Sequence, residues 1–288
     1  YKDNTGTVKL LASNATSAPV TTFSAGTTGF TPSTATTGAI TLAGTLATTN
    51  GGTGLTSFTA NQVFYASSTS AVGQSTNFQF NGTTLTLAND ASISGLTVGK
   101  GGGAVANNTA IGSGVLQANS SGGSSTGVGY QALYNATSGA HVAVGQQALY
   151  SNTSGTYGVA VGYQAGFTNL TGNYNVAIGA QALYLNTASQ NTAVGYQAGY
   201  TNSTGANLTA LGYKAGFLST GNSNTFVGNS AGYNTTGTNN TFVGAVGSVD
   251  GCGALVTTGS KNTIIGGYDG NQGGLDIRTA SNYIVLSD

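Results

Sequence analysis

A glycine that follows a β-branched or aliphatic residue recurs at a short, nearly constant interval between residues 107 and 266. Successive glycines lie 16 or 17 residues apart, except for a last interval of 22 residues. A fixed short period is the sequence signature of a solenoid, in which each repeat forms one coil. The pattern predicts about ten coils, anchored at Gly112, Gly129, Gly145, Gly162, Gly179, Gly195, Gly212, Gly228, Gly244 and Gly266.

The residues before each glycine alternate between large and small side chains. The position directly before the glycine is aliphatic, the third position before it is Thr or Val, and the one between is mostly Ala. This period of two predicts a β-strand. We expect the aliphatic column to point inward as a dry ladder that includes Val144, Val161, Ile178 and Val194. A stripe of alanine on a second face is expected to pack against neighbouring copies of the chain.

Two further columns follow the glycine. Glutamine recurs two positions after it, and an aromatic residue recurs five positions after it, as at Tyr150, Phe167, Tyr184 and Tyr200. Like residues in stacked parallel coils lie about 4.8 Å apart, so amides can form ladders and rings can stack. Each coil has room for two strands of about five residues and two turns. The predicted fold class is therefore all-β, a flat parallel β-roll (β-solenoid) with two sheets.

Residues 1–106 lack a fixed period but keep signs of β structure. The segment 78–87 alternates around an Asn-Gly pair and predicts a β-hairpin, and 91–98 alternates as a half-buried strand does. The remainder is too polar to bury a large core within one chain, so we expect copies of the chain to associate. The predicted division is an irregular β-rich segment at 1–106, the repeat array at 107–266 and a junction at 267–288.

The composition agrees with an all-β chain and excludes several classes of function. Glycine supplies 48 of 288 residues, charged residues are 4% of the chain, and neither Glu nor Met occurs, so long helices are not expected. The formal net charge is zero and no basic cluster exists, which argues against nucleic-acid binding. We also expect no membrane insertion, because no apolar run is long enough, and we find no signal peptide or lipidation motif.

The sequence offers little for catalysis. The single histidine, His141, occupies a column that is otherwise mostly asparagine, so a structural role is expected. The single cysteine, Cys252, excludes an intrachain disulfide, and only Lys261 lies close enough in sequence to activate its thiol. The six aspartates are scattered, without the regular aspartate of calcium-binding β-rolls. We therefore expect no enzymatic activity, no cofactor and no metal site.

The repeat loses its uniformity near the end of the array. Alanine in the strand column gives way to Phe226 and Phe242, and the last interval contains an insertion at 248–260. Binding sites often interrupt a uniform repeat, so we expect any ligand contact here, although a junction to a following domain is the interpretation that we favour. The candidate residues for either role are Cys252, Tyr268, Asp269, Asp276 and Arg278.

Several repeat glycines are directly followed by tyrosine, as at Tyr130, Tyr163, Tyr196 and Tyr213. Exposed aromatic rings beside Gln and Asn side chains are able to stack on sugar rings. Rings that wedge between subunits, with the hydroxyl group reaching water, are the interpretation that we favour.

The repeat unit at 191–200, Asn-Thr-Ala-Val-Gly-Tyr-Gln-Ala-Gly-Tyr, resembles the repeats of bacteriophage tail-fibre and other virion-fibre proteins. It is also similar to the head repeat of trimeric autotransporter adhesins, which reads Asn-Ser-Val-Ala-Ile-Gly and is matched best at 175–179. The glycine-rich stretches at 50–58, 95–103 and 270–278 resemble linkers of phage fibres, which favours the phage fibres over the adhesins.

The resemblance implies a structural fibre segment of a phage virion, in a tail fibre or similar extracellular appendage, that forms a homotrimeric shaft involved in host-cell attachment. The implied partners are further copies of the chain, other virion proteins and a glycan or protein of the host surface. In that family a segment like 270–288 often precedes a C-terminal intramolecular chaperone, which trimerises the fibre and then cleaves itself off.

Two alternatives stay open. The first is the head passenger of a bacterial trimeric adhesin, located on the bacterial cell surface. The second is an ice-binding solenoid, a class that requires regular ranks of exposed threonine. The alternation of Thr with Val in the strand column argues for burial of that column and against this class.

Overall fold

The structure, a computed structural model, describes residues 30–32, 42–44, 59–68, 71–245 and 251–287. The stretch at 50–58 and the start of the insertion at 248–260 lie outside these ranges. The chain forms two compact units, 1–88 and 89–288. The regular elements of the described ranges are β-strands, and the described part of the chain contains no helix that could span a membrane.

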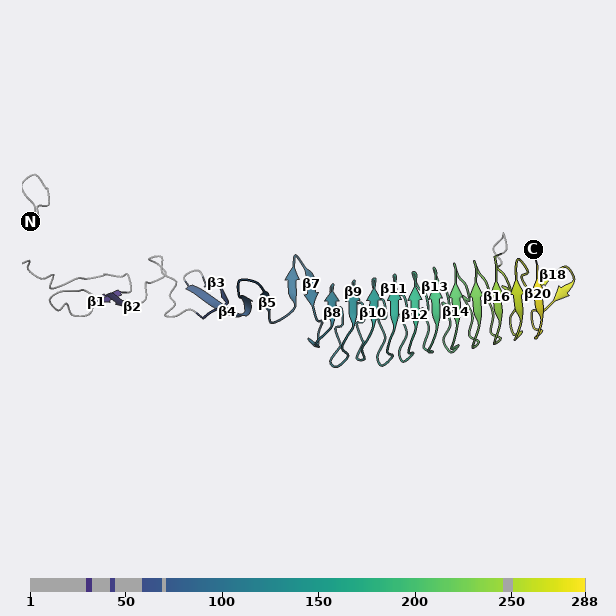
Figure 1. The fold of residues 1–288 in the computed structure, drawn as a ribbon, viewed down its shortest axis with the longest axis horizontal. Helices are drawn as coiled ribbons and strands as arrows, with labels where there is room; N and C mark the ends of the chain where they lie inside the picture. The colour runs from purple at the N-terminus through teal and green to yellow at the C-terminus, as the bar shows by residue number, and fades with distance from the viewer. Residues whose placement is uncertain (1–29, 33–41, 45–58, 69–70, 246–250, 288) are drawn as a thin grey trace, which may run out of the picture. The chain divides into compact units, whose positions relative to one another are not determined.

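The strands of the first unit are antiparallel. β1 (Phe30–Pro32) pairs with β2 (Leu42–Gly44), and β3 (Gln62–Ser68), β4 (Ala71–Phe80) and β5 (Leu85–Leu87) form a second sheet (Figure 1). The predicted hairpin is present as the β4–β5 pair. Its turn is closed by Asn81, whose side-chain oxygen accepts hydrogen bonds from the backbone N–H groups of Thr83 and Thr84.

The second unit is a stack of coils that share one sheet. Within the described residues this sheet has 13 strands. It begins with antiparallel β6 (Ala91–Ile93) and β7 (Leu96–Gly99). The strands after β7 are parallel to one another and are β8 (Thr109–Ile111), β9 (Thr126–Val128), β10 (Val142–Val144), β11 (Val159–Val161), β12 (Val176–Ile178), β13 (Thr192–Val194), β14 (Thr209–Leu211), β15 (Thr225–Val227), β16 (Thr241–Val243), β17 (Thr263–Ile265) and β20 (Ile284–Leu286). The predicted parallel β-solenoid of about ten coils is confirmed.

The sheet extends past both predicted limits of the array. At its start, 91–98 was expected to be one strand, but Ser94 and Gly95 have φ of +50° and +84° and turn the chain between β6 and β7. At its end, β20 pairs with β17 in parallel. The hairpin of β18 (Asn271–Gln272) and β19 (Leu275–Asp276) interrupts this last coil.

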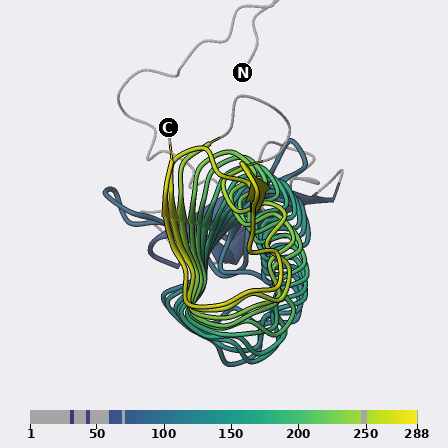
Figure 2. The ribbon, with the colours of Figure 1, turned by 90° about the vertical axis from the view of Figure 1, so that its right-hand side faces the viewer.

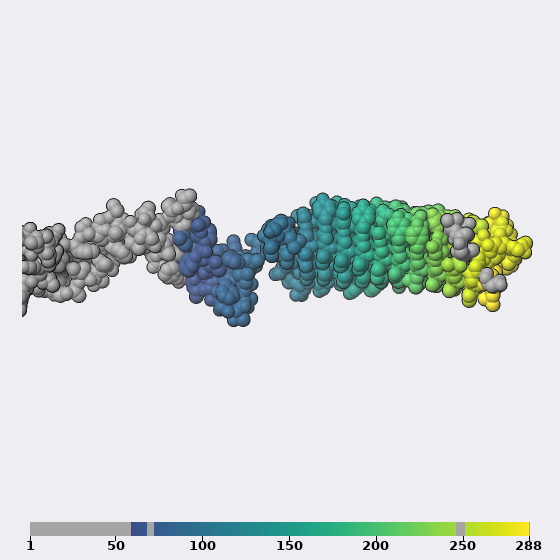
Figure 3. All heavy atoms as spheres, turned by 90° about the horizontal axis from the view of Figure 1, so that it is seen from above, coloured from purple at the N-terminus to yellow at the C-terminus, as the bar shows by residue number. Residues whose placement is uncertain are grey.

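The side of each coil opposite the sheet is built of turns, so the prediction of two sheets is wrong. Gln164 and Gly166 have φ of +51° and +61°, left-handed values that an extended strand does not contain. Successive coils are still bonded here, because Gly166 N–H donates to the Ala182 carbonyl oxygen at 2.9 Å and Thr168 N–H donates to that of Tyr184 at 3.0 Å. The coils therefore superpose when viewed along the stack (Figure 2) and form parallel ridges in the space-filling view (Figure 3).

The repeat glycine ends each strand where neighbouring coils approach backbone to backbone. Gly162 has φ of +137°, and a Cβ atom placed there would lie 2.7 Å from the carbonyl carbon and oxygen of Gly179. Any side chain at this position would push the two coils apart. Glycine therefore recurs once in every coil because no larger residue fits at this contact.

The columns of the strand face the opposite way from the prediction. In β11, Ala160 is buried while Val161 is 37% exposed, and Ile178 on the next coil is 38% exposed. The alanines after the glycine, such as Ala165, are buried as well. The expected inward aliphatic ladder and outward alanine stripe are thus wrong. Leucine side chains of the turn side, such as Leu149, already fill the interior beside Ala160, so the strand contributes only a methyl group there and its larger aliphatic side chains point outward.

Interior side chains compensate one another in size. A Cβ atom added to Gly166 would lie 2.9 Å from the Leu149 side chain, so leucine from one coil fills the space beside glycine of the next. A Cβ atom added to Gly232 would lie 2.4 Å from the ring of Phe226. The change from Ala to Phe late in the array therefore alters how the interior is filled and does not open a site.

We expect Phe226→Ala and Gly232→Leu each to destabilise the protein and the double substitution to recover much of the loss. The first leaves a cavity that costs about 3–5 kcal/mol, and the second drives a leucine into the Phe226 ring. Backbone strain does not prevent the exchange, because Leu149 and Leu183 already adopt φ of +50° and +49° in this column. Denaturant unfolding of the four proteins measures the coupling, and strictly additive losses would contradict it.

Candidate functional site

The candidate residues at the C-terminal edge fall into a buried and an exposed group. Cys252 and Tyr268 are buried in successive coils of the interior alanine column. Their register follows from the backbone, because Gly232 N–H donates to the Cys252 carbonyl oxygen at 2.9 Å and Gly253 N–H donates to that of Tyr268 at 2.8 Å. Both side chains therefore fill the coil interior.

Burial removes Cys252 from the ligand candidates. Desolvation raises the pKa of its thiol to about 12, and Sγ lies 3.7 Å from the Ile264 carbonyl oxygen. A neutral thiol enclosed in this way is neither a nucleophile nor a ligand contact. Tyr268 is equally enclosed, and its hydroxyl group donates to the Leu275 carbonyl oxygen at 2.8 Å, which anchors the β18–β19 hairpin.

Asp269, Asp276 and Arg278 lie around the same hairpin. Asp269 accepts a hydrogen bond from the backbone N–H of Asn271 at 2.8 Å. Arg278 Nη2 and Nε donate to the two carboxylate oxygens of Asp276 at 2.7 and 3.0 Å, and these hydrogen bonds lower the pKa of Asp276. The one arginine of the chain is thus neutralised by its neighbour. The exposed group shapes a turn and presents no uncompensated guanidinium to a ligand.

His141 replaces an asparagine inside the coil. At the equivalent position, Asn175 Oδ1 accepts the backbone N–H of Asn191 at 2.9 Å. His141 Nδ1 accepts the backbone N–H of Gly158 at 3.0 Å, so the ring performs the same task. Desolvation lowers the pKa of His141 and favours the neutral imidazole that this bond requires.

A second column of buried asparagines was not recognised in the sequence. Asparagine recurs seven positions after the repeat glycine, as at Asn152, Asn169, Asn186 and Asn202. The two asparagine columns meet inside the coil, where Asn191 Nδ2 donates to Asn186 Oδ1 at 2.9 Å. The regular spacing was a visible signal of this column. Its amides bond polar groups that the turns bring inside.

Two ladders lie along the turn side of the coils. Glutamine side chains bond from coil to coil, for example Gln164 Nε2 to Gln147 Oε1 at 3.0 Å. The aromatic residues stack face to face with ring centroids 5.0–5.2 Å apart and comprise Tyr134, Tyr150, Phe167, Tyr184, Tyr200, Phe217 and Tyr233. The rings are half-buried and rest against the coils.

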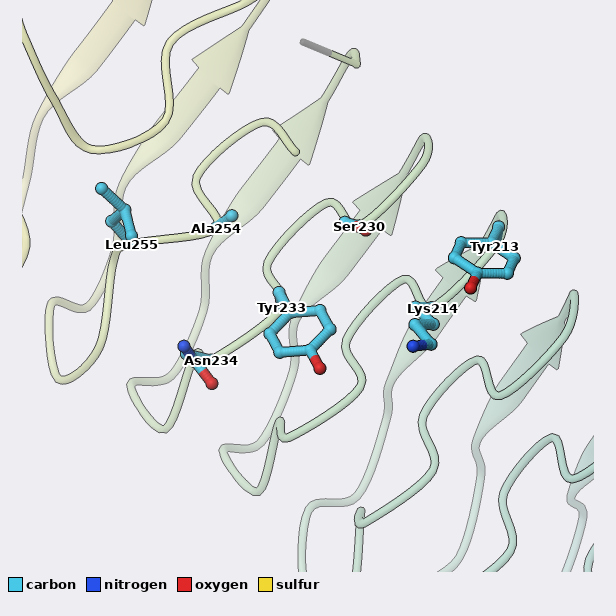
Figure 4. Close-up of a pocket in the computed structure, with 7 residues that line it drawn as sticks. All are labelled: Tyr213, Lys214, Ser230, Tyr233, Asn234, Ala254 and Leu255. Carbon is cyan, nitrogen blue, oxygen red and sulfur yellow. The ribbon is translucent and has the colours of Figure 1, made fainter. Parts of the chain in front are cut away.

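A concavity of about 320 Å³ lies where these ladders end (Figure 4). It spans three successive coils of the second unit. Its walls combine aromatic, cationic, amide and apolar side chains, and the lining residues are Tyr213, Lys214, Ser230, Tyr233, Asn234, Ala254 and Leu255.

The described residues bring together no cluster of His, Cys, Asp and Glu side chains that could hold a metal ion. No family model, curated protein or solved structure matches the chain. The functional proposal therefore stands on the architecture and on the surfaces that it exposes.

We expect the stability of the protein to fall below about pH 6.5 because of His141. The folded-state pKa of His141 lies below its ordinary value of 6.5. Its contribution is therefore complete above that value and is lost as the pH falls through the folded-state pKa. The slope is at most about 1.4 kcal/mol per pH unit. His141→Asn should remove this dependence, because an amide oxygen accepts the Gly158 N–H at any pH.

Urea unfolding at about pH 7.5 and about pH 5 checks this, since aspartates titrate mostly below that window. His141→Asn should narrow the difference in unfolding free energy between the two conditions. An unchanged difference in the variant would show that another group controls the acid response.

Proposed function

We propose that this chain is a structural fibre segment of a phage virion, in a tail fibre or similar appendage, that forms a homotrimeric shaft involved in host-cell attachment. The observation that carries the proposal is the outer face of the parallel sheet. A mechanical role of this kind needs long, repetitive, self-associating surface and no catalytic group.

On the outer face of the sheet one column is aliphatic along the whole array, and the other is Thr or Val. Val142 is 41% exposed and Ile265, many coils later, is 48% exposed. Across β8 to β17 the outward positions described in the structure are Thr, Val, Ile and Leu, without a charged residue. A continuous, partly exposed aliphatic column of this length, without charge beside it, is typical of an interaction face.

The partner that matches this face best is another copy of the chain. Side chains on the face repeat once per coil, and only a partner with the same coil spacing keeps its contacts in register along the array. The absence of charge in the described outward positions means that like faces do not repel each other. The resemblance of the repeat to trimeric fibres supports three copies.

The same face supports a second candidate, an ice-binding solenoid. The sequence argument against that class was burial of the Thr and Val column, whereas Val142 in this column is exposed in the single chain. The two outward residues of a strand are Thr and an aliphatic residue, as in β13, whereas the ice-binding class would place Thr at both.

The adhesin head alternative would use the same trimeric packing. A membrane-anchor barrel and a heptad stalk in the full-length gene would distinguish it from a phage fibre.

We expect light scattering to report a trimer and Val161→Asp to yield a folded monomer. The charge lands on the outer face, where it is repeated in every copy and opposes packing, while the coil interior is untouched. Ala160→Asp, one residue away, places the charge among buried methyl groups and should unfold the coils. Far-UV circular dichroism separates the two outcomes.

Val161→Thr is the matched control and should leave the assembly intact, because threonine occupies the neighbouring outward column. A stable, folded monomer of the parent chain at micromolar concentration would overturn the trimeric shaft. Inhibition of ice recrystallisation by that monomer would favour the ice-binding candidate.

A further inference from the structure

The aromatic ladder stops before the array does. Each ring up to Phe217 has a ring stacked on the next coil, and Phe217 itself stacks on Tyr233 at 5.0 Å. The next residue in this column is Ala254, by the register that places Cys252 beside Ala231. A methyl group covers much less than a ring. One face of Tyr233 therefore has no ring against it among the described residues.

A second stack of tyrosines ends beside the first. Tyr196 and Tyr213 are stacked with centroids 5.4 Å apart, and the same position of the next coil is Asn229. Tyr213 and Tyr233, on consecutive coils, both line the concavity of about 320 Å³ (Figure 4). Two aromatic stacks thus terminate at one place on the surface.

The concavity carries one charge and several hydrogen-bonding groups. Lys214 Nζ lies 5.4 Å from the ring centroids of Tyr213 and Phe217. Asn234 adds an amide, and the residues that line the concavity include no carboxylate. Lys214 also occupies the glutamine column, so the stack itself requires no charge at this position. The lysine distinguishes this coil from those before it.

We propose that the concavity binds a pyranose ring that carries a carboxylate, as in a uronic acid. The C–H bonds on the apolar face of a pyranose present positive ends to the negative face of an aromatic ring. The pyranose would lie against Tyr233, in the place that the next aromatic residue of the ladder would occupy. The Lys214 ammonium would pair with the carboxylate, and the Asn234 amide would bond ring hydroxyl groups. The volume suits one sugar residue.

This inference rests on the proposed attachment role for its biological purpose, but sugar binding can be tested without it. The probes are an oligosaccharide ending in glucuronic acid and its counterpart ending in glucose. Saturation-transfer NMR and titration calorimetry on the whole chain should detect the acidic probe more strongly. Lys214→Gln restores the residue of the other coils and should weaken the acidic probe about tenfold, with little effect on the neutral one.

Ala254→Tyr is the decisive variant, because it continues the aromatic ladder into the space that the sugar would fill. Binding of both probes should be lost while the melting temperature is retained, which shows that the fold accommodates the tyrosine although Ala254 is only 4% exposed in the parent. Ala180→Tyr makes the same change in the column of Tyr213, two coils away from the concavity, and should leave binding intact. Unaltered binding by Ala254→Tyr, or no saturation transfer with either probe, would overturn the site. Equal affinity for the two probes would overturn the acidic specificity.

Light scattering of the same samples keeps this test separate from the shaft proposal. A trimer that binds neither probe overturns the sugar site alone. A monomer whose binding is lost in Ala254→Tyr supports the sugar site and overturns the trimeric shaft.

Discussion

Hydrogen bonding between successive coils is the constraint on which the rest of this structure depends. Each parallel strand pairs residue for residue with the next, as Val144 does with Val161, and the turn side is bonded coil to coil as well. Every side chain therefore lies above its counterpart one repeat earlier. A residue that suits its position in one coil suits it in other coils wherever the neighbouring side chains have the same size. Columns of like residues follow from this geometry.

The same constraint explains the scarcity of charge. A charged column would place like charges about 4.8 Å apart along the stack, where their repulsion is substantial even near water. Amides avoid this cost, because each carries a donor and an acceptor, as Gln147 and Gln164 show. Inside the coil, asparagine and His141 bond backbone groups of the next coil. A polar interior is tolerated because these bonds satisfy most of its donors and acceptors, with Asn152 Oδ1 among the exceptions.

The period of the sequence predicted the stack and the membership of its columns, but not the direction in which they face. Alternation shows which residues share a face of a strand, and not which face is inside. The assumption that large residues point inward failed at Val161, because leucine side chains of the turns, such as Leu149, fill the interior beside Ala160. The turn side was mistaken for a strand, since the left-handed φ of Gln164 has no signature in residue type. The interior place of Cys252 was hidden because the sequence assigned it to the insertion at 248–260, whereas the bonds between coils align it with the interior alanine column.

The position of a residue within its column determines what it can do. In the middle of a ladder both faces of a side chain are occupied by neighbours, so Phe167 has a ring on each side and no free ring face for a ligand. At the end of a ladder one face loses its partner, as at Tyr233. A residue that interrupts a column inside the coil, such as His141, can change the stability of the protein but not its binding, because no ligand can reach it. Chemistry toward other molecules is therefore expected where an exposed column ends, and Lys214 and Tyr233 meet that condition together.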